Sequence, residues 1–84
     1  MNLKERERNL RRRYGITPSG VQFFNIMQGG KCGLCSKLPT STDKLVIDHD
    51  HITGRVRGLL HVSCNSKLAW YEHNKERINK WVMK

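Results

Sequence analysis

The sequence predicts a small α+β domain in which a β-hairpin packs on helices, with further helices at the N-terminal and C-terminal ends. Helix-forming segments flank a short β-rich stretch in the middle of the chain. Only 37% of the 84 residues are apolar, and a core of that size does not hold so short a chain unaided. Two pairs of potential metal ligands enclose the β-rich stretch: Cys32 with Cys35, and His61 with Cys64. We therefore expect a bound metal ion to stabilise the fold.

We expect one domain over residues 1–84, composed of a basic helical arm at about 1–14, a core at about 17–73 and a C-terminal helix at about 74–84. The arm carries six basic side chains between residues 2 and 14. Only a thin apolar stripe runs along it, so the arm would rest lightly on the core with its arginines outward. An arm that contacts phosphates and a merely solvated helix face explain these charges equally well. The stripe consists of Leu3, Leu10 and Tyr14, and the arginines are Arg6, Arg8, Arg11, Arg12 and Arg13.

A second helix is predicted after Gly15, which ends the first. Thr17 followed by Pro18 is the pattern of an N-cap and a first helical residue. Apolar residues recur along this segment with helical spacing, and the pair Gly29-Gly30 ends it. We expect the apolar face to belong to the core. Its members are Val21, Phe23, Phe24, Ile26 and Met27.

The remaining elements are a hairpin and further helices. After a polar loop at 39–43, the run Leu45–Ile47 reads as a strand, residues 52–54 as its turn, and Val56–Leu60 as the return strand. Ser63 then suits the N-cap of a helix that carries Cys64. A separate last helical segment is predicted from about Lys75 to Met83.

Charge and cysteine content restrict the class of protein. Lysines and arginines number 16 against 7 acidic residues, a formal net charge of +9, so a polyanion is the expected partner. Nucleic acid is the commonest polyanion, and the alternatives are an incidentally basic protein or one that binds acidic lipid. Three cysteines cannot close a disulfide framework, which favours metal ligation and a reducing cytoplasm. We see no signal peptide and no stretch long enough to cross a membrane, so we expect a cytoplasmic protein without membrane contact.

The two ligand pairs have the spacing of a structural zinc site. Ligands two residues apart let one tight turn occupy two corners of a tetrahedron, and two such pairs leave no position for substrate. Cys32 and Cys35 alone would also suit a redox motif, but the matching His61 and Cys64 favour zinc. His61 is the least certain of the four ligands, with His73 or a water molecule as the alternative.

A second group of polar residues lies between and beside these pairs. Asp48 and Asn65 offer hard oxygen donors for a divalent cation, and His49 can take a proton from water at neutral pH. Such a set suits hydrolysis of a phosphodiester. Neighbours on a strand face opposite sides, so Asp48 and His49 can share one site only if the strand ends or bulges there. A solvated hairpin end, another zinc site and a helix-capping Asn65 are the alternatives.

Four segments of the chain resemble the phage recombination endonuclease VII group, which belongs to the HNH, or ββα-metal, nucleases. The resemblance covers roughly residues 14 to 70, and its central block, from Ile47 to Leu60, is the most specific part. The segments are Tyr14–Thr17, Gln28–Cys35, Ile47–Leu60 and Cys64–Leu68.

The resemblance implies a zinc-stabilised ββα-metal (HNH) fold with one structural Zn²⁺ and one catalytic Mg²⁺ or Mn²⁺. It implies that Asp48 and Asn65 bind the catalytic cation, that His49 is the general base and that His51 assists at the scissile phosphate. Products of this chemistry carry 5′-phosphate and 3′-hydroxyl ends. The family usually has cysteine where this chain has His61, and imidazole can replace thiolate at zinc.

The function expected from the resemblance is metal-dependent DNA endonuclease activity with low sequence specificity, in a phage-encoded protein that acts in the host cell. Junction-resolving relatives dimerise through a long C-terminal extension that this sequence lacks, so we expect a monomer. A dimeric Holliday-junction resolvase using Trp70 and Trp81 is one alternative, although we expect both to be core or rim residues. Another is a non-catalytic zinc module that docks on a DNA-packaging partner such as the phage terminase. Candidate DNA contacts, with ordinary surface charge as the alternative, are Arg55, Arg57, Lys67, Arg11, Arg12 and Arg13.

Overall fold

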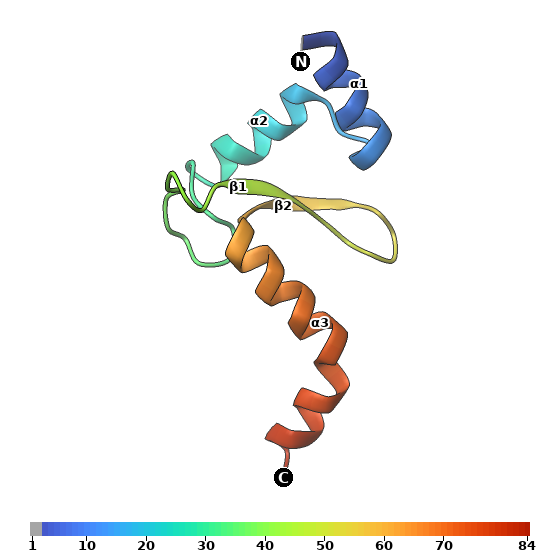
Figure 1. The fold of residues 1–84 in the computed structure, drawn as a ribbon, viewed down its shortest axis with the longest axis vertical. Coiled ribbons are helices and arrows are strands. Elements are labelled where there is room, and N and C mark those ends of the chain that lie inside the picture. The colour runs from blue at the N-terminus through green and yellow to red at the C-terminus, as the bar shows by residue number, and fades with distance from the viewer. Residues whose placement is uncertain (1–2) are drawn as a thin grey trace.

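A computed structural model describes residues 3–84, without the side chains of Leu3, Arg12, Arg13 and Tyr14. Within those residues it contains three helices and one antiparallel hairpin, which confirms the α+β class (Figure 1). The elements, in chain order, are α1 (Leu3–Tyr14), α2 (Pro18–Met27), β1 (Leu45–His49), β2 (Val56–His61) and α3 (Val62–Val82).

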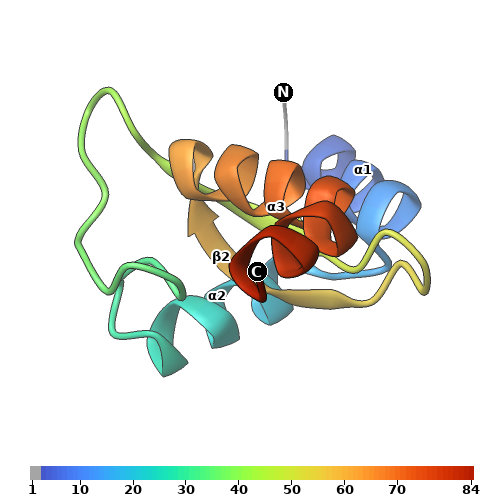
Figure 2. The ribbon, with the colours of Figure 1, turned by 90° about the horizontal axis from the view of Figure 1, so that it is seen from below.

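The molecule is elongated because α3 runs away from the rest of it. In Figure 1 the hairpin lies in the middle, α1 and α2 lie on one side of it, and α3 leaves from the other. Figure 2, a view nearly along α3, shows the other elements grouped around the helix axis. The radius of gyration is 14.8 Å, whereas a compact chain of this length has about 12 Å. Much of α3 therefore has no packing partner within the described residues.

The hairpin contains an irregularity that matters for the site. β1 pairs with β2 from Leu45 opposite His61 as far as Asp48 opposite Gly58. The next pair is His49 with Val56, so the register shifts and Arg57 has no partner on β1. Such a bulge bends the strand and redirects side chains.

The turn that closes the hairpin is held by Asp50. Its carboxylate accepts hydrogen bonds from the backbone N–H groups of Ile52 (2.8 Å) and Thr53 (3.0 Å). Its own N–H donates to the carbonyl of Arg55 at 2.8 Å. These local bonds place the turn where the sequence predicts it.

Gln28 joins the end of α2 to the free edge of β2. Its side-chain oxygen accepts a hydrogen bond from the N–H of Leu59 (2.9 Å), and its amide nitrogen donates to the carbonyl of the same residue (2.8 Å). The amide also donates to the carbonyl of Lys31 at 2.8 Å. One side chain thus replaces a paired strand at this edge and anchors the loop that follows.

Two helix starts differ in how they are capped. The Thr17 hydroxyl accepts the N–H of Gly20 at 3.1 Å, as predicted for α2. At α3 the predicted Ser63 cap is wrong, because the helix begins at Val62 without a side-chain cap from its own N-cap residue. Instead, the Asp43 carboxylate accepts the N–H of Ser63 (3.1 Å) and its hydroxyl. Asp43, a loop residue, therefore accepts the hydrogen bond of a backbone N–H group in the first turn of α3.

The core is small and lies around two of the three cysteines. The cluster of buried residues consists of Cys32, Leu60 and Cys64, with Leu45 and Leu68 packed against it. Ile16 and Leu59 are the other buried apolar residues of the described part. The core thus centres on the predicted metal ligands.

The prediction that the apolar face of α2 belongs to the core is wrong for three of its residues. Phe23, Ile26 and Met27 are 57%, 68% and 69% exposed, while Val21 and Phe24 are half-buried. The reason is geometric: a two-stranded hairpin offers a surface too narrow to cover a whole helix face.

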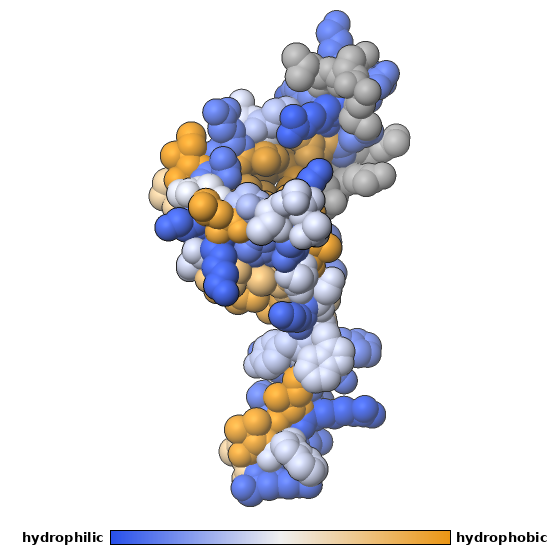
Figure 3. Space-filling view, turned by 60° about the vertical axis from the view of Figure 1, so that its left-hand side comes forward, coloured by the Kyte–Doolittle hydropathy of each residue, from blue (hydrophilic) through white to orange (hydrophobic). Residues whose placement is uncertain are grey.

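The C-terminal half of the chain also differs from the prediction. One helix spans 62–82, without the break expected near residue 74. Trp70 and Trp81 are 64% and 71% exposed, so neither is a core residue. Figure 3 shows apolar side chains at the surface along the far end of α3, where Val82 is 74% exposed. No helix of the described residues has the length and apolar character that a membrane span requires.

On α1, the described arginines point outward as predicted: Arg6, Arg8 and Arg11 are exposed. Arg11 forms an ion pair with Glu7 at 2.7 Å, within the same helix. The side chains of Arg12 and Arg13, predicted DNA contacts, lie outside the described residues.

Replacing Gly58 by alanine tests how tightly Gln28 holds the hairpin. Gly58 has φ +152°, and an added Cβ would lie 2.7 Å from the Gln28 side-chain oxygen. We expect Gly58→Ala to lower the free energy of unfolding of the zinc-loaded protein by about 2 kcal/mol, measured by chemical denaturation. In a Gln28→Ala background the cost should be smaller, because the clash is gone. Equal costs in both backgrounds would contradict the contact.

Candidate metal centre and active site

The structure brings the four predicted zinc ligands together. Their ligand atoms all lie within 4.8 Å of one another. Cys32, His61 and Cys64 are buried and Cys35 is exposed. Tetrahedral zinc, with bonds of about 2.0–2.3 Å, places neighbouring ligand atoms roughly 3.5 Å apart. The separations of 3.2 Å between Cys35 Sγ and His61 Nδ1, and 4.0 Å between Cys64 Sγ and the same nitrogen, bracket this value. The donor set therefore fits zinc.

Three parts of the chain meet at this cluster. Cys32 and Cys35 lie in the loop after α2, His61 is the last residue of β2, and Cys64 lies in the first turn of α3. A metal ion here would join the loop, the hairpin and the helix at one point.

A backbone carbonyl sets the orientation of the His61 ring. Its Nε2 lies 3.0 Å from the carbonyl oxygen of Leu38, to which it donates. This bond places the proton on Nε2 and leaves the Nδ1 lone pair facing the thiols. Ligating histidines are commonly held by such an outer hydrogen bond, which also raises their basicity. The same bond raises the pKa of His61.

The buried cysteines differ in acidity. Burial by itself raises the pKa of the Cys32 thiol, but backbone N–H groups from Cys35, His61 and Leu34 outweigh it and lower the pKa to about 6. Burial raises the pKa of the Cys64 thiol to about 11, with the neighbouring sulfur atoms adding to it. The surroundings of Cys32 thus favour its thiolate form, and metal binding requires Cys64 to lose a proton.

Asp48 and His49 lie where the register of the hairpin shifts. Asp48 is buried at 5% exposure, and half-buried His49 is the last residue of β1. β1 ends here, opposite the bulge that Arg57 forms in β2, so the condition that the strand ends where the two neighbours serve one site is met. His51 follows in the exposed turn, and its ring centroid lies 4.9 Å from that of His49.

The guanidinium of Arg57 binds the Asp48 carboxylate with two hydrogen bonds. Its Nε lies 2.8 Å from Oδ2, and its Nη2 lies 3.0 Å from Oδ1. The third nitrogen, Nη1, lies 2.9 Å from Glu72 Oε1 on α3. The hydrogen bond to Asp48, followed by that to Glu72, raises the pKa of the guanidinium. Arg57 reaches Asp48 because the register shift leaves it without a partner on β1.

The other predicted site residues are placed less closely. Asn65 is half-buried in the first turn of α3, directly after a zinc ligand, and no hydrogen bond joins it to Asp48 in the described part of the chain. Arg55 and Lys67 are exposed, as expected of DNA contacts. Glu72 could not be recognised as a site residue from the sequence, because it lies among alternating charges of a helix.

Two adjoining hollows flank Arg57. The smaller, of about 240 Å³, contains Asp48 and Gln28. The larger, of about 700 Å³, lies between the hairpin turn and α3, and we call it the α3 groove. Arg57 and Leu68 line both hollows and so form the wall between them. The α3 groove is also lined by polar residues that were not predicted as site residues: Tyr71, Glu72, His73 and Lys75.

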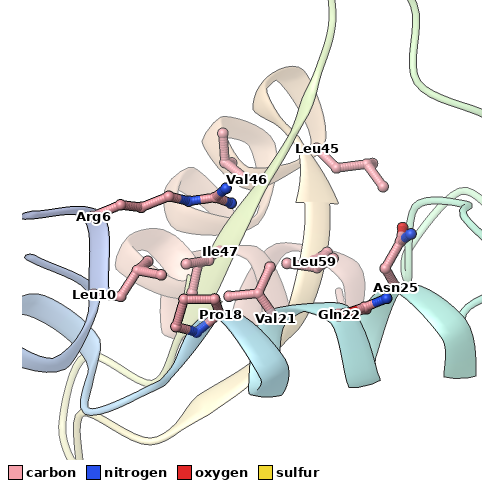
Figure 4. Close-up of a pocket in the computed structure, with 10 residues that line it drawn as sticks. All are labelled: Arg6, Leu10, Pro18, Val21, Gln22, Asn25, Leu45, Val46, Ile47 and Leu59. Atoms are coloured by element: carbon pink, nitrogen blue, oxygen red, sulfur yellow. The ribbon is translucent and has the colours of Figure 1, made fainter. Parts of the chain in front are cut away.

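A third groove, of about 640 Å³, lies on the other side of the hairpin, between α1, α2 and β1. Figure 4 shows Arg6 reaching from α1 across it toward Val46, with Leu10 and Pro18 beside it. Its walls are largely apolar, and it contains none of the candidate catalytic residues.

Fold and site together define a small protein built from a hairpin and helices around a cluster of Cys₃His side chains that fits a zinc ion. A sequence model of the recombination endonuclease VII family matches residues 7–83, and the chain belongs to that family. It is 45% identical over 60 residues to the Gene 59 protein of Mycobacterium phage L5, covering 68% of this chain. It is 43% identical over 58 residues to the Gene 59 protein of Mycobacterium phage D29, again covering 68% of this chain. The matches span 35% of the length of each relative. No solved structure matches the chain significantly.

Substitutions at His61 test the cluster. We expect His61→Ala to lose zinc and helical structure, because one buried ligand is removed, whereas His61→Cys should retain one zinc per chain. Metal content and circular dichroism would be measured at neutral pH. The matched control is His73→Ala, which should keep its zinc. Loss of zinc in that control would mean that the fourth ligand has been misassigned.

Proposed function

We propose that this chain is a metal-dependent DNA endonuclease of the HNH, or ββα-metal, type, cutting or nicking DNA with low sequence specificity. The observation that carries the proposal is the placement of Asp48 and His49 at the end of β1, opposite the bulge in β2. Membership in the recombination endonuclease VII family supports it independently. The hairpin followed at once by α3, with the metal cluster at their junction, is consistent with the ββα arrangement.

In this proposal Asp48 and Asn65 hold the catalytic Mg²⁺ or Mn²⁺. A carboxylate and a side-chain amide are hard oxygen donors, which suit such cations. When bound, the cation would stabilise negative charge on the phosphate and on the leaving oxygen. Asn65 follows Cys64 directly, so the zinc cluster would control the approach of its side chain.

His49 acts as the general base in the proposed reaction. A ring nitrogen of His49 takes the proton from the attacking water, which neutral imidazole can do near pH 7. The exposed ring of His51, 4.9 Å away between centroids, is available to hydrogen-bond the scissile phosphate. His49 ends β1 and His51 follows in the turn held by Asp50, so the two rings can act as a preorganised pair.

The α3 groove is the proposed binding site for the DNA strand. It adjoins the Asp48 hollow and is lined by His51, His73 and Lys75. Basic and hydrogen-bonding side chains of this kind contact phosphates without reading the bases. The formal net charge of +9 adds a general attraction for the backbone. Binding of this type gives little sequence preference.

Removing the proposed base should stop cleavage. We expect His49→Ala to lower the rate of plasmid nicking in Mg²⁺ or Mn²⁺ at least about 100-fold. Zinc content, circular dichroism and DNA affinity should stay at wild-type values. Supercoiled, linear, single-stranded and four-way-junction DNA would be compared side by side. A His49→Ala variant that cuts as fast as wild type would refute the assignment of the base.

Lys75 and Lys80 form a matched pair for testing the α3 groove. Lys75 lines the groove and Lys80 lies in the last turn of α3, away from it. We expect Lys75→Ala to weaken duplex binding about fivefold at any sequence, and to reduce the salt dependence by about one phosphate contact. Fluorescence anisotropy without divalent cation or chelator measures both. If Lys80→Ala has the same effect, the DNA strand does not bind in the α3 groove.

A further inference from the structure

Arg57 and a divalent cation would compete for the same atoms. Both oxygens of Asp48 accept hydrogen bonds from the guanidinium, at 2.8 Å and 3.0 Å. The carboxylate is 5% exposed, so a cation has little access from any other direction. Ligation of Mg²⁺ or Mn²⁺ needs at least one of these oxygens. A cation can therefore enter only as Arg57 withdraws from at least one of them.

Before a cation binds, the Arg57 guanidinium is stabilised at the Asp48 carboxylate. A buried carboxylate without a partner is strongly unfavourable, and an arginine that pairs with both oxygens compensates for its burial. The register shift between β1 and β2 directs Arg57 to this task. The pair thus holds the Asp48 carboxylate in one orientation.

Glu72 gives Arg57 a second anchor that persists after Asp48 is released. Its carboxylate lies 2.9 Å from Nη1, the nitrogen that Asp48 does not use. The side chain of Arg57 is 35% exposed and lines both the Asp48 hollow and the α3 groove. Withdrawal from Asp48 would therefore leave Nε and Nη2 free at the wall of the α3 groove. These two donors have the spacing that binds phosphate oxygens in pairs.

The net charge of Asp48, Arg57 and Glu72 taken together changes sign when a divalent cation binds. Two carboxylates and one guanidinium carry one net negative charge, which attracts a cation. A divalent cation converts this to one net positive charge, which attracts a phosphodiester. The order of events that follows is cation first, then phosphate.

We propose that Arg57 is a positioning residue that holds Asp48 in the absence of a catalytic cation and transfers to a DNA phosphate when the cation binds, while Glu72 retains it. The inference rests on the proposed function and adds an exchange of partners at its site. It revises the role of Arg57 from a simple DNA contact to a competitor of the cation.

Binding of Mn²⁺ without DNA tests the exchange. In the zinc-loaded protein, we expect Arg57→Ala to bind Mn²⁺ about tenfold more tightly than wild type by isothermal titration calorimetry, because the competitor is gone. Mn²⁺ does not displace zinc from thiolates, so the two sites stay separate. DNA cleavage by the same variant should be slower. Tighter binding together with slower cleavage is not what structural damage would produce.

Arg55→Ala is the matched control, since it removes the same charge two residues away on an exposed side chain. Its Mn²⁺ affinity should change less than about twofold. If Arg57→Ala does not retain zinc, Arg57→Lys decides: a lysine makes a weaker, single-point contact, so its Mn²⁺ affinity should lie above that of wild type. An affinity equal to or below wild type in the folded variant, or an equal gain in Arg55→Ala, overturns the exchange.

The two proposals fail in different ways. A wild-type protein that does not cut any DNA refutes the proposed function, whatever the Mn²⁺ affinities are. A wild-type protein that cuts DNA, with no gain of Mn²⁺ affinity in Arg57→Ala, refutes only the exchange. Asp48→Asn should abolish Mn²⁺ binding in both backgrounds, and Mn²⁺ binding that survives it would place the cation elsewhere and overturn the exchange as well.

Discussion

The convergence of Cys32, Cys35, His61 and Cys64 is the constraint on which the rest of the structure depends. Two of these cysteines are themselves among the few buried apolar residues of the described chain, so the metal cluster and the hydrophobic core are one object. A chain of 84 residues with an elongated shape and a narrow hairpin has little else to hold it together. The carbonyl of Leu38 orients the histidine, and backbone N–H groups stabilise the Cys32 thiolate, so the loop around the cluster prepares it for an ion.

The candidate active site is positioned by short connections from this cluster. β2 carries Arg57 at one end and the ligand His61 at the other, and α3 begins with the ligand Cys64 followed by Asn65. The Asp48–Arg57–Glu72 pairs then join β1, β2 and α3 by charge. A small protein can in this way hold polar groups in register without a large core, because covalent neighbours of a metal ligand move little once the ligand is bound.

The overall positive charge and the local cluster of carboxylates act on different ligands. The overall charge of +9 suits a long polyanion, and it acts at a distance. The carboxylates of Asp48 and Glu72 form a local exception, and Arg57 balances them. In the proposed exchange, the site accepts first a cation and then a phosphate, and Arg57 neutralises the carboxylate before the cation binds and the phosphate afterwards. The proposed nuclease function, which rests partly on family membership, requires both partners at one place.

The sequence by itself determined the features that depend on residues close together in the chain. The ligand pairs with two residues between their members, the Thr17 cap, the position of the hairpin turn and the short strands could all be predicted, because each depends on contacts within a few residues. It also indicated that Asp48 and His49 require an interrupted strand.

Tertiary structure alone decided the features that depend on contacts between distant segments. The exposure of Phe23 and Trp81 follows from how little surface the hairpin offers, which no local pattern reports. Gln28 at the end of α2 hydrogen-bonds to β2, a contact between distant segments. The pairing of Arg57 with Glu72 likewise depends on the register shift and on the direction of α3. Hydrogen bonds and ion pairs act over a few ångströms, so their partners are settled only when packing has brought the segments together.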